Sequence, residues 1–216
     1  MQPRFCYNKR AQETLAAFVN GGRFPHALLL EGPEGSGRRT FAREIAAALF
    51  CRGEHKPCGS CSQCRKVLER NHPDVEYYGG DGSRRSFHID TIRQLRQNAW
   101  LLPGEAPCRV CVLCGAENMT DQAQNALLKI LEEPPEHTVF ILTAENRAML
   151  LPTILSRVQT IRLEPLTPAE ILPVLRERCP DQPGEKLEWA AETADTIGQA
   201  LALLADESLQ KHAQLA

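Results

Sequence analysis

The sequence lacks any long hydrophobic run. Its longest apolar stretches, such as residues 27–30 and 110–113, are far shorter than the roughly 18 residues that a membrane span needs. The polar, charged N-terminus also lacks the apolar core of a signal peptide. Internal repeats and low-complexity tracts are missing as well. These absences predict a cytoplasmic protein with no membrane-spanning segment.

The sequence also lacks an excess of charge of either sign. The 25 basic and 27 acidic side chains give a formal net charge of −2. A protein that holds nucleic acid through bulk charge needs a clear surplus of Lys and Arg. Any contact with nucleic acid must therefore be local or shared with partners.

Short apolar strands alternate with segments of helical spacing. The predicted strands cover residues 27–30, 75–78, 109–114, 139–143 and 158–163. Such alternation implies crossover connections, so we expect an α/β fold with a mostly parallel three-layer sheet. From Thr167 onward a capping-box helix start and three helical stretches follow without a strand. We predict an α/β domain over residues 1–165 and a small all-helical domain over residues 166–216.

A glycine-rich turn joins the first predicted strand to a helix and follows the phosphate-loop pattern. Its candidate phosphate-binding residues are Gly32, Gly35, Gly37, Arg38 and Arg39. Arg38 stands where the pattern has lysine, and Arg39 stands where it has a magnesium-binding hydroxyl. Two interpretations remain: an empty or weakly anion-binding loop, or nucleotide binding through the backbone amides and the two arginines alone.

The strand that normally carries the metal-holding and water-activating acids also departs from the pattern. It ends in Cys114-Gly115 instead of a pair of acidic residues. Neither residue can hold magnesium or polarise water. We therefore predict that the chain does not hydrolyse ATP.

Four of the nine cysteines lie in a polar insertion with the spacing C-x6-C-x2-C-x2-C. They are Cys51, Cys58, Cys61 and Cys64. Four thiolates in a loop-rich segment suit tetrahedral zinc, and a cytosolic protein disfavours disulfides. We predict a closed structural zinc site, with His55 as the alternative to Cys51 in the fourth position.

Three further cysteines, Cys108, Cys111 and Cys114, have a similar spacing but lie on a predicted strand. Alternation along a strand places Cys111 on the opposite face from the other two, so the three cannot share one metal. We expect them to be reduced core residues. Cys6 and Cys179 are isolated, and the sequence assigns them no role.

Several motifs resemble bacterial clamp-loader subunits of the AAA+ class, and together they span nearly the whole chain. They are residues 26–33, 71–74, 89–93, 125–135 and 151–157, of which the run ending in Glu133-Pro134-Pro135 is highly specific. This family includes an ATP-hydrolysing gamma/tau kind and a delta-prime kind that is often nucleotide-free. The degenerate loop favours the delta-prime kind. Gly198 stands where the gamma/tau kind has a phosphate-sensing arginine, and Thr143 stands at the first phosphate sensor.

The resemblance implies an AAA+ P-loop-type parallel sheet with a zinc-binding insertion at residues 51–64 and a small all-helical lid domain. It implies a non-hydrolysing ring subunit that helps load a sliding clamp onto primed DNA. The expected partners are the gamma/tau motor subunits, the clamp-opening delta subunit, the clamp, and primed DNA through the assembly. Structural Zn²⁺ is the expected cofactor, and ATP is expected not to bind.

Ser156-Arg157-Val158 resembles a Ser-Arg-Cys motif whose arginine enters the ATP site of the neighbouring motor subunit. The resemblance therefore makes Arg157, with Ser156, a catalytic residue in trans. Taken alone, Arg157 would be interpreted as a solvated loop arginine. Val158 replaces the cysteine of the family.

Two rival functions remain: an active gamma/tau-type clamp-loader ATPase with a variant P-loop, and a regulatory nucleotide or anion sensor outside replication. The family also has a C-terminal helical collar domain, which residues 1–216 have no room to include. We expect the collar to be absent and the isolated chain to be monomeric.

Overall fold

The computed structural model describes residues 7–79, 87 and 89–206. Its central element is a five-stranded sheet with the order β2-β3-β4-β1-β5, in which all neighbouring strands are parallel. The strands are β1 (Ala27–Glu31), β2 (Val75–Tyr78), β3 (Arg109–Cys114), β4 (Thr138–Ala144) and β5 (Gln159–Arg162). The predicted α/β fold with a parallel sheet is confirmed.

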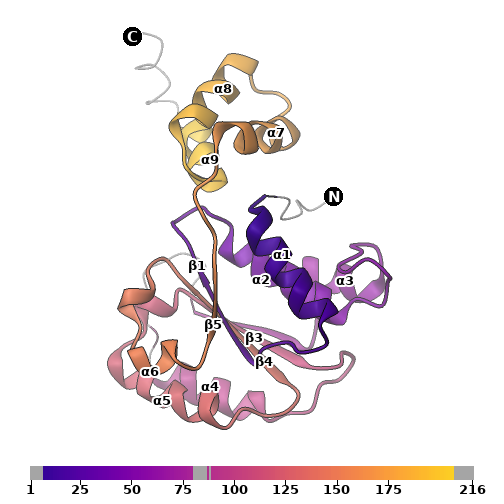
Figure 1. Ribbon diagram of the computed structural model, residues 1–216, viewed down its shortest axis with the longest axis vertical. Coiled ribbons are helices and arrows are strands. Elements are labelled where there is room, and N and C mark those ends of the chain that lie inside the picture. Colours follow the sequence, from indigo (N-terminus) through magenta and orange to yellow (C-terminus); the bar gives the residue numbers. More distant parts are fainter. Residues whose placement is uncertain (1–6, 80–86, 88, 207–216) are drawn as a thin grey trace.

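Helices cover both faces of the sheet (Figure 1). One face carries α1 (Lys9–Asn20), α2 (Arg38–Phe50) and α3 (Ser62–Leu68). The other carries α4 (Ile89–Ala99), α5 (Asp121–Glu132) and α6 (Pro152–Leu155). Two short 3₁₀ turns, η1 (Ala116–Asn118) and η2 (Arg147–Met149), follow β3 and β4.

Alternating side chains of the inner strands divide the core into two layers. Leu28 and Leu30 pack with the α1–α2 layer, whereas Leu29 packs with the α4–α5 layer. Every residue of β3 and β4 is buried. Burial on both faces explains why these strands are continuous apolar runs in the sequence.

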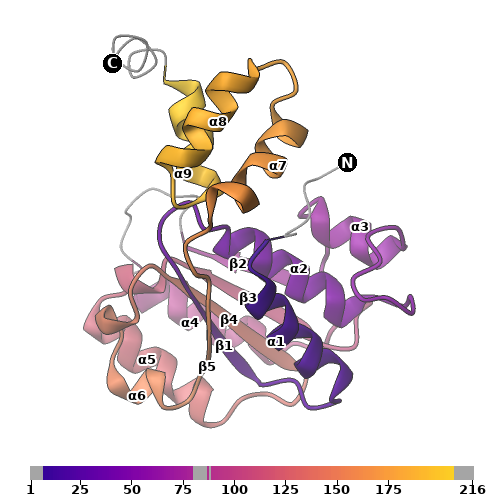
Figure 2. The same ribbon diagram turned by 45° about the horizontal axis from the view of Figure 1, so that its top comes forward.

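Three helices follow the sheet: α7 (Pro168–Arg178), α8 (Gly184–Thr193) and α9 (Ile197–Ala205). At the start of α7 the Thr167 amide donates to the Glu170 carboxylate (2.9 Å), as the predicted capping box requires. After Arg162, the described part of the chain contains no further strand. The three helices stand beyond one end of the sheet (Figures 1 and 2). The domain boundary at residues 165 and 166 stays a prediction.

A few local features were not expected from the sequence. Asp90 lies in the first turn of α4, where it pairs with Arg93. Helix α6 was not predicted, because four residues are too few for a periodic pattern. Within the described ranges, none of the helices is both long and apolar enough to cross a membrane.

Candidate functional site

The glycine-rich loop lies between β1, which ends at Glu31, and α2, which begins at Arg38. Gly35 and Gly37 adopt left-handed backbone angles, with φ of +79° and +84°. Only glycine takes such angles without strain. The chain therefore has the strand, loop and helix arrangement of a phosphate loop.

The first turn of α9 lies directly on this loop (Figure 2). The Gly198 amide donates to the Gly35 carbonyl (3.0 Å), and the buried Thr196 hydroxyl donates to the Glu34 carbonyl (3.1 Å). A Cβ atom on Gly198 would lie 2.4 Å from the Gly35 Cα. The backbones of loop and helix are thus in contact, at the residue where the resemblance predicts the loss of a phosphate-sensing arginine.

Arg38 makes ion pairs within the chain. Its Nη2 lies 3.2 Å from a carboxylate oxygen of Glu145, and its Nη1 lies 4.0 Å from Glu117. The Arg38 and Glu117 side chains are only 13% and 15% exposed. In an active phosphate loop the residue at this position contacts the β- and γ-phosphates. Here the chain's own carboxylates already neutralise its charge.

The ends of β3 and β4 also offer no free catalytic group. Cys114 and Thr143 are paired in the sheet, and the Gly115 amide donates to the Thr143 hydroxyl oxygen (3.0 Å). Burial raises the pKa of the Cys114 thiol, although the nearby Arg39 charge opposes that effect. Arg39 itself is half-buried in the first turn of α2.

The four cysteines of the insertion converge between α2 and α3. Their sulfur atoms all lie within 4.8 Å of one another, and the Sγ atoms of Cys58 and Cys64 are 4.0 Å apart. Tetrahedral zinc with bonds of about 2.3 Å places its sulfur ligands about 3.8 Å apart. The group Cys51, Cys58, Cys61 and Cys64 can therefore hold one metal ion. His55, the alternative ligand, is exposed and lies outside this group.

Backbone amides point at the sulfur atoms of this group. The amides of Gly53 and Cys58 both donate to the Cys51 sulfur (3.3 Å each). The Cys61 amide donates to the Cys58 sulfur (3.3 Å), and the Cys64 amide to the Cys61 sulfur (3.5 Å). Such donors favour the thiolate, the form in which cysteine binds metal. The chemistry of the donors therefore fits a thiolate-bound cation.

The pKa values of two thiols in the group shift in opposite directions. Hydrogen bonds from the Ser60 hydroxyl and the Cys61 amide lower the pKa of Cys58 to about 5. Burial raises the pKa of Cys64, which is fully buried. The outer side of the group is thus suited to thiolates, and its inner side packs into the core.

The remaining cysteines behave as predicted where the structure describes them. Cys108 and Cys114 pack with the core layer of α1 and α2, and Cys111 packs with the opposite layer. Their expected role as reduced core residues agrees with this placement. Cys179 is half-buried at the end of α7, and Cys6 lies outside the described residues.

Arg157 lies between α6 and β5, with its side chain 33% exposed. Its Nη1 donates to the Thr153 carbonyl (2.8 Å) and to the Ser156 hydroxyl oxygen (3.2 Å). Its Nη2 lies 2.8 Å from a carboxylate oxygen of Glu132 at the end of α5. The guanidinium thus lies at the surface with three partners in the same chain.

Sequence reasoning missed the acidic partners of both arginines. Glu145 is 107 residues from Arg38, and no local pattern connects residues so far apart. The contact between Glu132 and Arg157 likewise joins α5 to the loop before β5. One indirect sign of a role for Glu132 is present in the sequence. Glu132 belongs to the family-specific motif that ends in Pro134 and Pro135.

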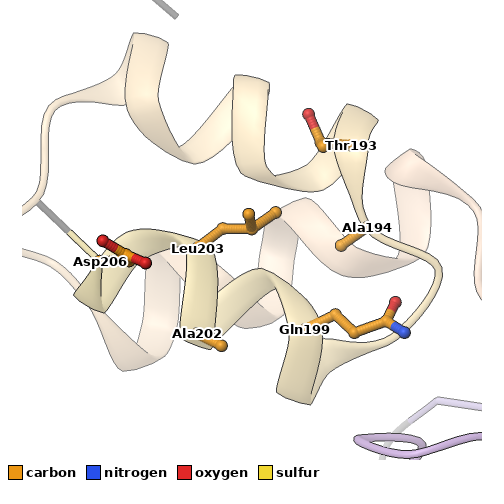
Figure 3. A pocket seen from close by; sticks show the side chains of 6 residues that line it. All are labelled: Thr193, Ala194, Gln199, Ala202, Leu203 and Asp206. Atoms are coloured by element: carbon orange, nitrogen blue, oxygen red, sulfur yellow. The ribbon is translucent and has the colours of Figure 1, made fainter. Parts of the chain in front are cut away.

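A shallow pocket of about 350 Å³ lies on the helical part of the chain (Figure 3). Its lining residues are Thr193, Ala194, Gln199, Ala202, Leu203 and Asp206. Asp206 is the single ionisable group among them. This pocket offers no arrangement for catalysis.

The chain is similar to bacterial DNA polymerase III subunits. A family model described as "DNA polymerase III, delta subunit" matches residues 7–167. The delta-prime subunit of Bacillus subtilis is 35% identical over 164 residues, which are 75% of this chain and 49% of that protein. The delta-prime subunit of Yersinia pestis is 39% identical over 138 residues, 63% of this chain and 41% of that protein. A gamma/tau subunit of Mycobacterium tuberculosis is 33% identical over 167 residues, which are 76% of this chain and 29% of that protein.

Solved structures show the same fold. A gamma subunit-related protein of Thermotoga maritima aligns with a TM-score of 0.55 and 25% identity, over 84% of this chain and 54% of that one. The RuvB Holliday junction branch migration motor of the same organism aligns with a TM-score of 0.62 over 92% of this chain and 61% of that one, at 14% identity. The second likeness concerns the fold alone.

The chain spans about half or less of the length of these three sequence relatives. The match to the family model nevertheless covers most of the sheet and its helices. Together with the identity to delta-prime subunits, it shows that this chain belongs to the DNA polymerase III delta-prime subunit family.

Proposed function

We propose that this chain is a non-hydrolysing subunit of the bacterial clamp loader, which helps to load the sliding clamp onto primed DNA. The observation that carries the proposal is the closed phosphate loop. The start of α9 rests on Gly35, and Arg38 is neutralised by Glu145 and Glu117. Relatives of both the delta-prime and the gamma/tau kind share the fold, so the state of this loop distinguishes between them.

ATP binding would need several changes in this loop. The phosphates would have to displace carboxylates from Arg38, and α9 would have to leave its hydrogen bond with Gly35. Phosphoryl transfer also needs a magnesium-binding hydroxyl and acidic residues. Their positions hold Arg39, Cys114 and Gly115. These features together support an accessory role without ATP turnover.

The chain's catalytic contribution would be made in a neighbouring subunit. Arg157 is partly exposed, and the chain holds its guanidinium at the surface. An arginine supplied in trans stabilises the charge that develops on the transferred phosphoryl group. In the ring that we propose, Arg157 with Ser156 enters the ATP site of a gamma/tau motor subunit.

The cysteine group would hold a structural Zn²⁺. All four ligand positions are taken by thiols, which leaves no open position for a substrate. The remaining partners would be the delta subunit and the clamp, with primed DNA contacted through the assembly. The near-neutral net charge of −2 supports shared DNA contact.

Measuring ATP binding and turnover by the purified chain tests the closed loop. We expect no binding by calorimetry and no magnesium-dependent turnover, with a gamma/tau subunit as the positive control. Clear turnover would instead favour an active gamma/tau-type ATPase with a variant loop. Failure to co-purify with motor subunits, combined with nucleotide or anion binding, would favour a sensor outside replication.

The trans role of Arg157 is tested in a reconstituted assembly. We expect Arg157→Ala to leave the chain folded and to slow the neighbouring ATP site by about 10³-fold to 10⁵-fold. DNA-stimulated ATPase of the assembly, with the sites resolved by single-turnover kinetics, measures the effect. An unchanged rate at every site would rule out the trans role.

A further inference from the structure

Two hydrogen-bond acceptors and one ion-pair partner contact the Arg157 guanidinium. Nη1 donates to the Thr153 carbonyl and the Ser156 hydroxyl, at 2.8 Å and 3.2 Å. Nη2 reaches the Glu132 carboxylate at 2.8 Å. Thr153 and Ser156 lie within four residues of Arg157, whereas Glu132 comes from a different helix. Glu132 is therefore the contact that fixes the guanidinium relative to the body of the protein.

The pattern of these contacts leaves one edge of the guanidinium available. An arginine side chain has five N–H donors in a planar fork. Two of them, both on Nη1, donate to Thr153 and Ser156, and Nη2 forms the ion pair with Glu132. The Nε–H, for which the described residues provide no hydrogen-bond acceptor, and one Nη2–H lie on the same edge of the plane. Such an edge binds two oxygen atoms of a phosphate side by side.

We propose that Glu132 is a positioning residue for Arg157: it holds the guanidinium so that its Nε/Nη2 edge faces the nucleotide of the neighbouring subunit. This inference rests on the proposed role of Arg157 in trans. It adds a second residue of this chain to the function of that site, and Glu132 acts only through Arg157.

The chemistry at the neighbouring site explains why orientation matters. In ATP hydrolysis a water oxygen bonds to the γ-phosphorus, the bond to the bridging oxygen breaks, and ADP and inorganic phosphate leave. Negative charge spreads over the phosphoryl oxygens in the transition state. An arginine already oriented toward those oxygens loses less side-chain freedom when it engages them.

The charge of Glu132 does not cancel this benefit. Its side chain is 48% exposed, so solvent weakens its field beyond the direct contact. The Arg157 side chain is also more exposed than that of Arg38, at 33% against 13%, so its ion pair is weaker than those of Arg38. The main effect of Glu132 is therefore to orient the Arg157 guanidinium.

The test uses the reconstituted assembly with variants of this chain. We expect Glu132→Ala to lower kcat at the adjoining ATP site about tenfold and to leave KM unchanged, because a misplaced catalytic group acts on the transition state. Glu132→Gln keeps an oxygen acceptor for Nη2 and should retain most of the rate. Glu136→Ala, which removes an exposed carboxylate in the loop after α5, is the matched control and should behave like the wild type.

A double-mutant comparison separates this inference from the proposed function. The Glu132→Ala/Arg157→Ala variant should be no slower than Arg157→Ala alone, because Glu132 acts only through the arginine. If Arg157→Ala is slow but Glu132→Ala matches the wild type, the positioning role is wrong and the trans role stands. If Arg157→Ala itself matches the wild type, the trans role fails.

A measurement without turnover checks the contact directly. NMR of the arginine side-chain nitrogens in the purified chain should show restricted rotation of the Arg157 Nη groups. In Glu132→Ala the Arg157 Nη groups should rotate faster, so that their separate signals average. In Glu136→Ala the signals should stay unchanged. Free rotation in the wild-type chain would overturn the positioning role whatever the kinetics show.

Discussion

The contact between Gly35 and Gly198 leaves no space for a side chain on either residue. A Cβ on Gly198 would lie 2.4 Å from the Gly35 Cα, which is backbone and cannot swing aside. We expect Gly198→Ala to lower the free energy of unfolding by about 1–3 kcal/mol, because loop or helix must shift. Denaturant unfolding measures this change.

Gly184 provides the matched control for that substitution. It also lies in the first turn of a helix, α8, and a Cβ there would meet nothing within 4 Å. Gly184→Ala should leave stability unchanged or raise it by up to about 1 kcal/mol. Equal effects of the two alanines would contradict the close packing of α9 on the loop.

Asp74, which precedes β2, forms hydrogen bonds with the segment that follows α4. Its carboxylate accepts hydrogen bonds from the amides of Gly104, Glu105 and Ala106, at 2.7, 2.8 and 2.9 Å. Burial by itself would raise the pKa of Asp74, but these donors lower it below its usual range. Asp74→Asn should therefore cost about 1–3 kcal/mol of unfolding free energy at pH 7.

The pH dependence follows from the direction of this shift. A carboxyl with a lowered folded-state pKa stabilises the fold fully above the unfolded-state pKa of about 3.9. That contribution disappears as the pH falls through the folded-state pKa. Unfolding curves of wild type and Asp74→Asn should thus converge at low pH. A difference that is independent of pH would contradict the role of the charge, and Asp90→Asn, at an exposed ion pair, is the control.

Single residues were predicted from the sequence only where the pattern was local. The spacing of Cys108, Cys111 and Cys114 is enough to assign their faces, because alternation is a property of any strand. The neutralisation of Arg38 depends on Glu117 and Glu145, which follow two different strands. Only the order of strands in the sheet brings those carboxylates together.

The insertion between α2 and α3 has little regular structure of its own and relies on its four thiols. We expect one zinc per chain by elemental analysis and its loss in Cys64→Ser, with unfolding free energy lowered by about 4 kcal/mol or more. Cys108→Ser, which changes a thiol outside the group, should keep the metal. A full zinc content in Cys64→Ser would contradict the assignment.

Most helices and strands followed from periodicity because their apolar spacing repeats over several residues. Helix α5 is an example: Leu127, Ile130 and Leu131 are buried on one face, and Thr120 caps it through the Ala123 amide. The packing of α9 on the phosphate loop has no such periodic signal. It depends on how the helical part meets the sheet, which apolar spacing does not encode.

The two parts of the chain share one hydrophobic cluster, which contains Leu28 and Leu30 of the sheet and Ile171, Leu187 and Ile197 of the helices. We therefore expect one cooperative unfolding transition. The two tryptophans report on each part separately, since Trp100 follows α4 and Trp189 lies in α8.

The measurement uses two single-tryptophan variants. Fluorescence of Trp189 in Trp100→Phe, and of Trp100 in Trp189→Phe, should give the same denaturant midpoint as far-UV circular dichroism of each variant. An earlier midpoint for Trp189 would mean that the helices separate from the sheet before it unfolds.

The closed phosphate loop also bears on how this chain can evolve. In the non-hydrolysing role that we propose, gaining ATP chemistry requires new residues at positions 38 and 39 in α2, at 114 and 115 where β3 ends, and at 198 in α9. A lysine at position 38 would still face Glu145, and any side chain at position 198 would collide with Gly35. We therefore expect neither change alone to give ATP turnover, so that single substitutions would not convert the proposed accessory subunit into an ATPase.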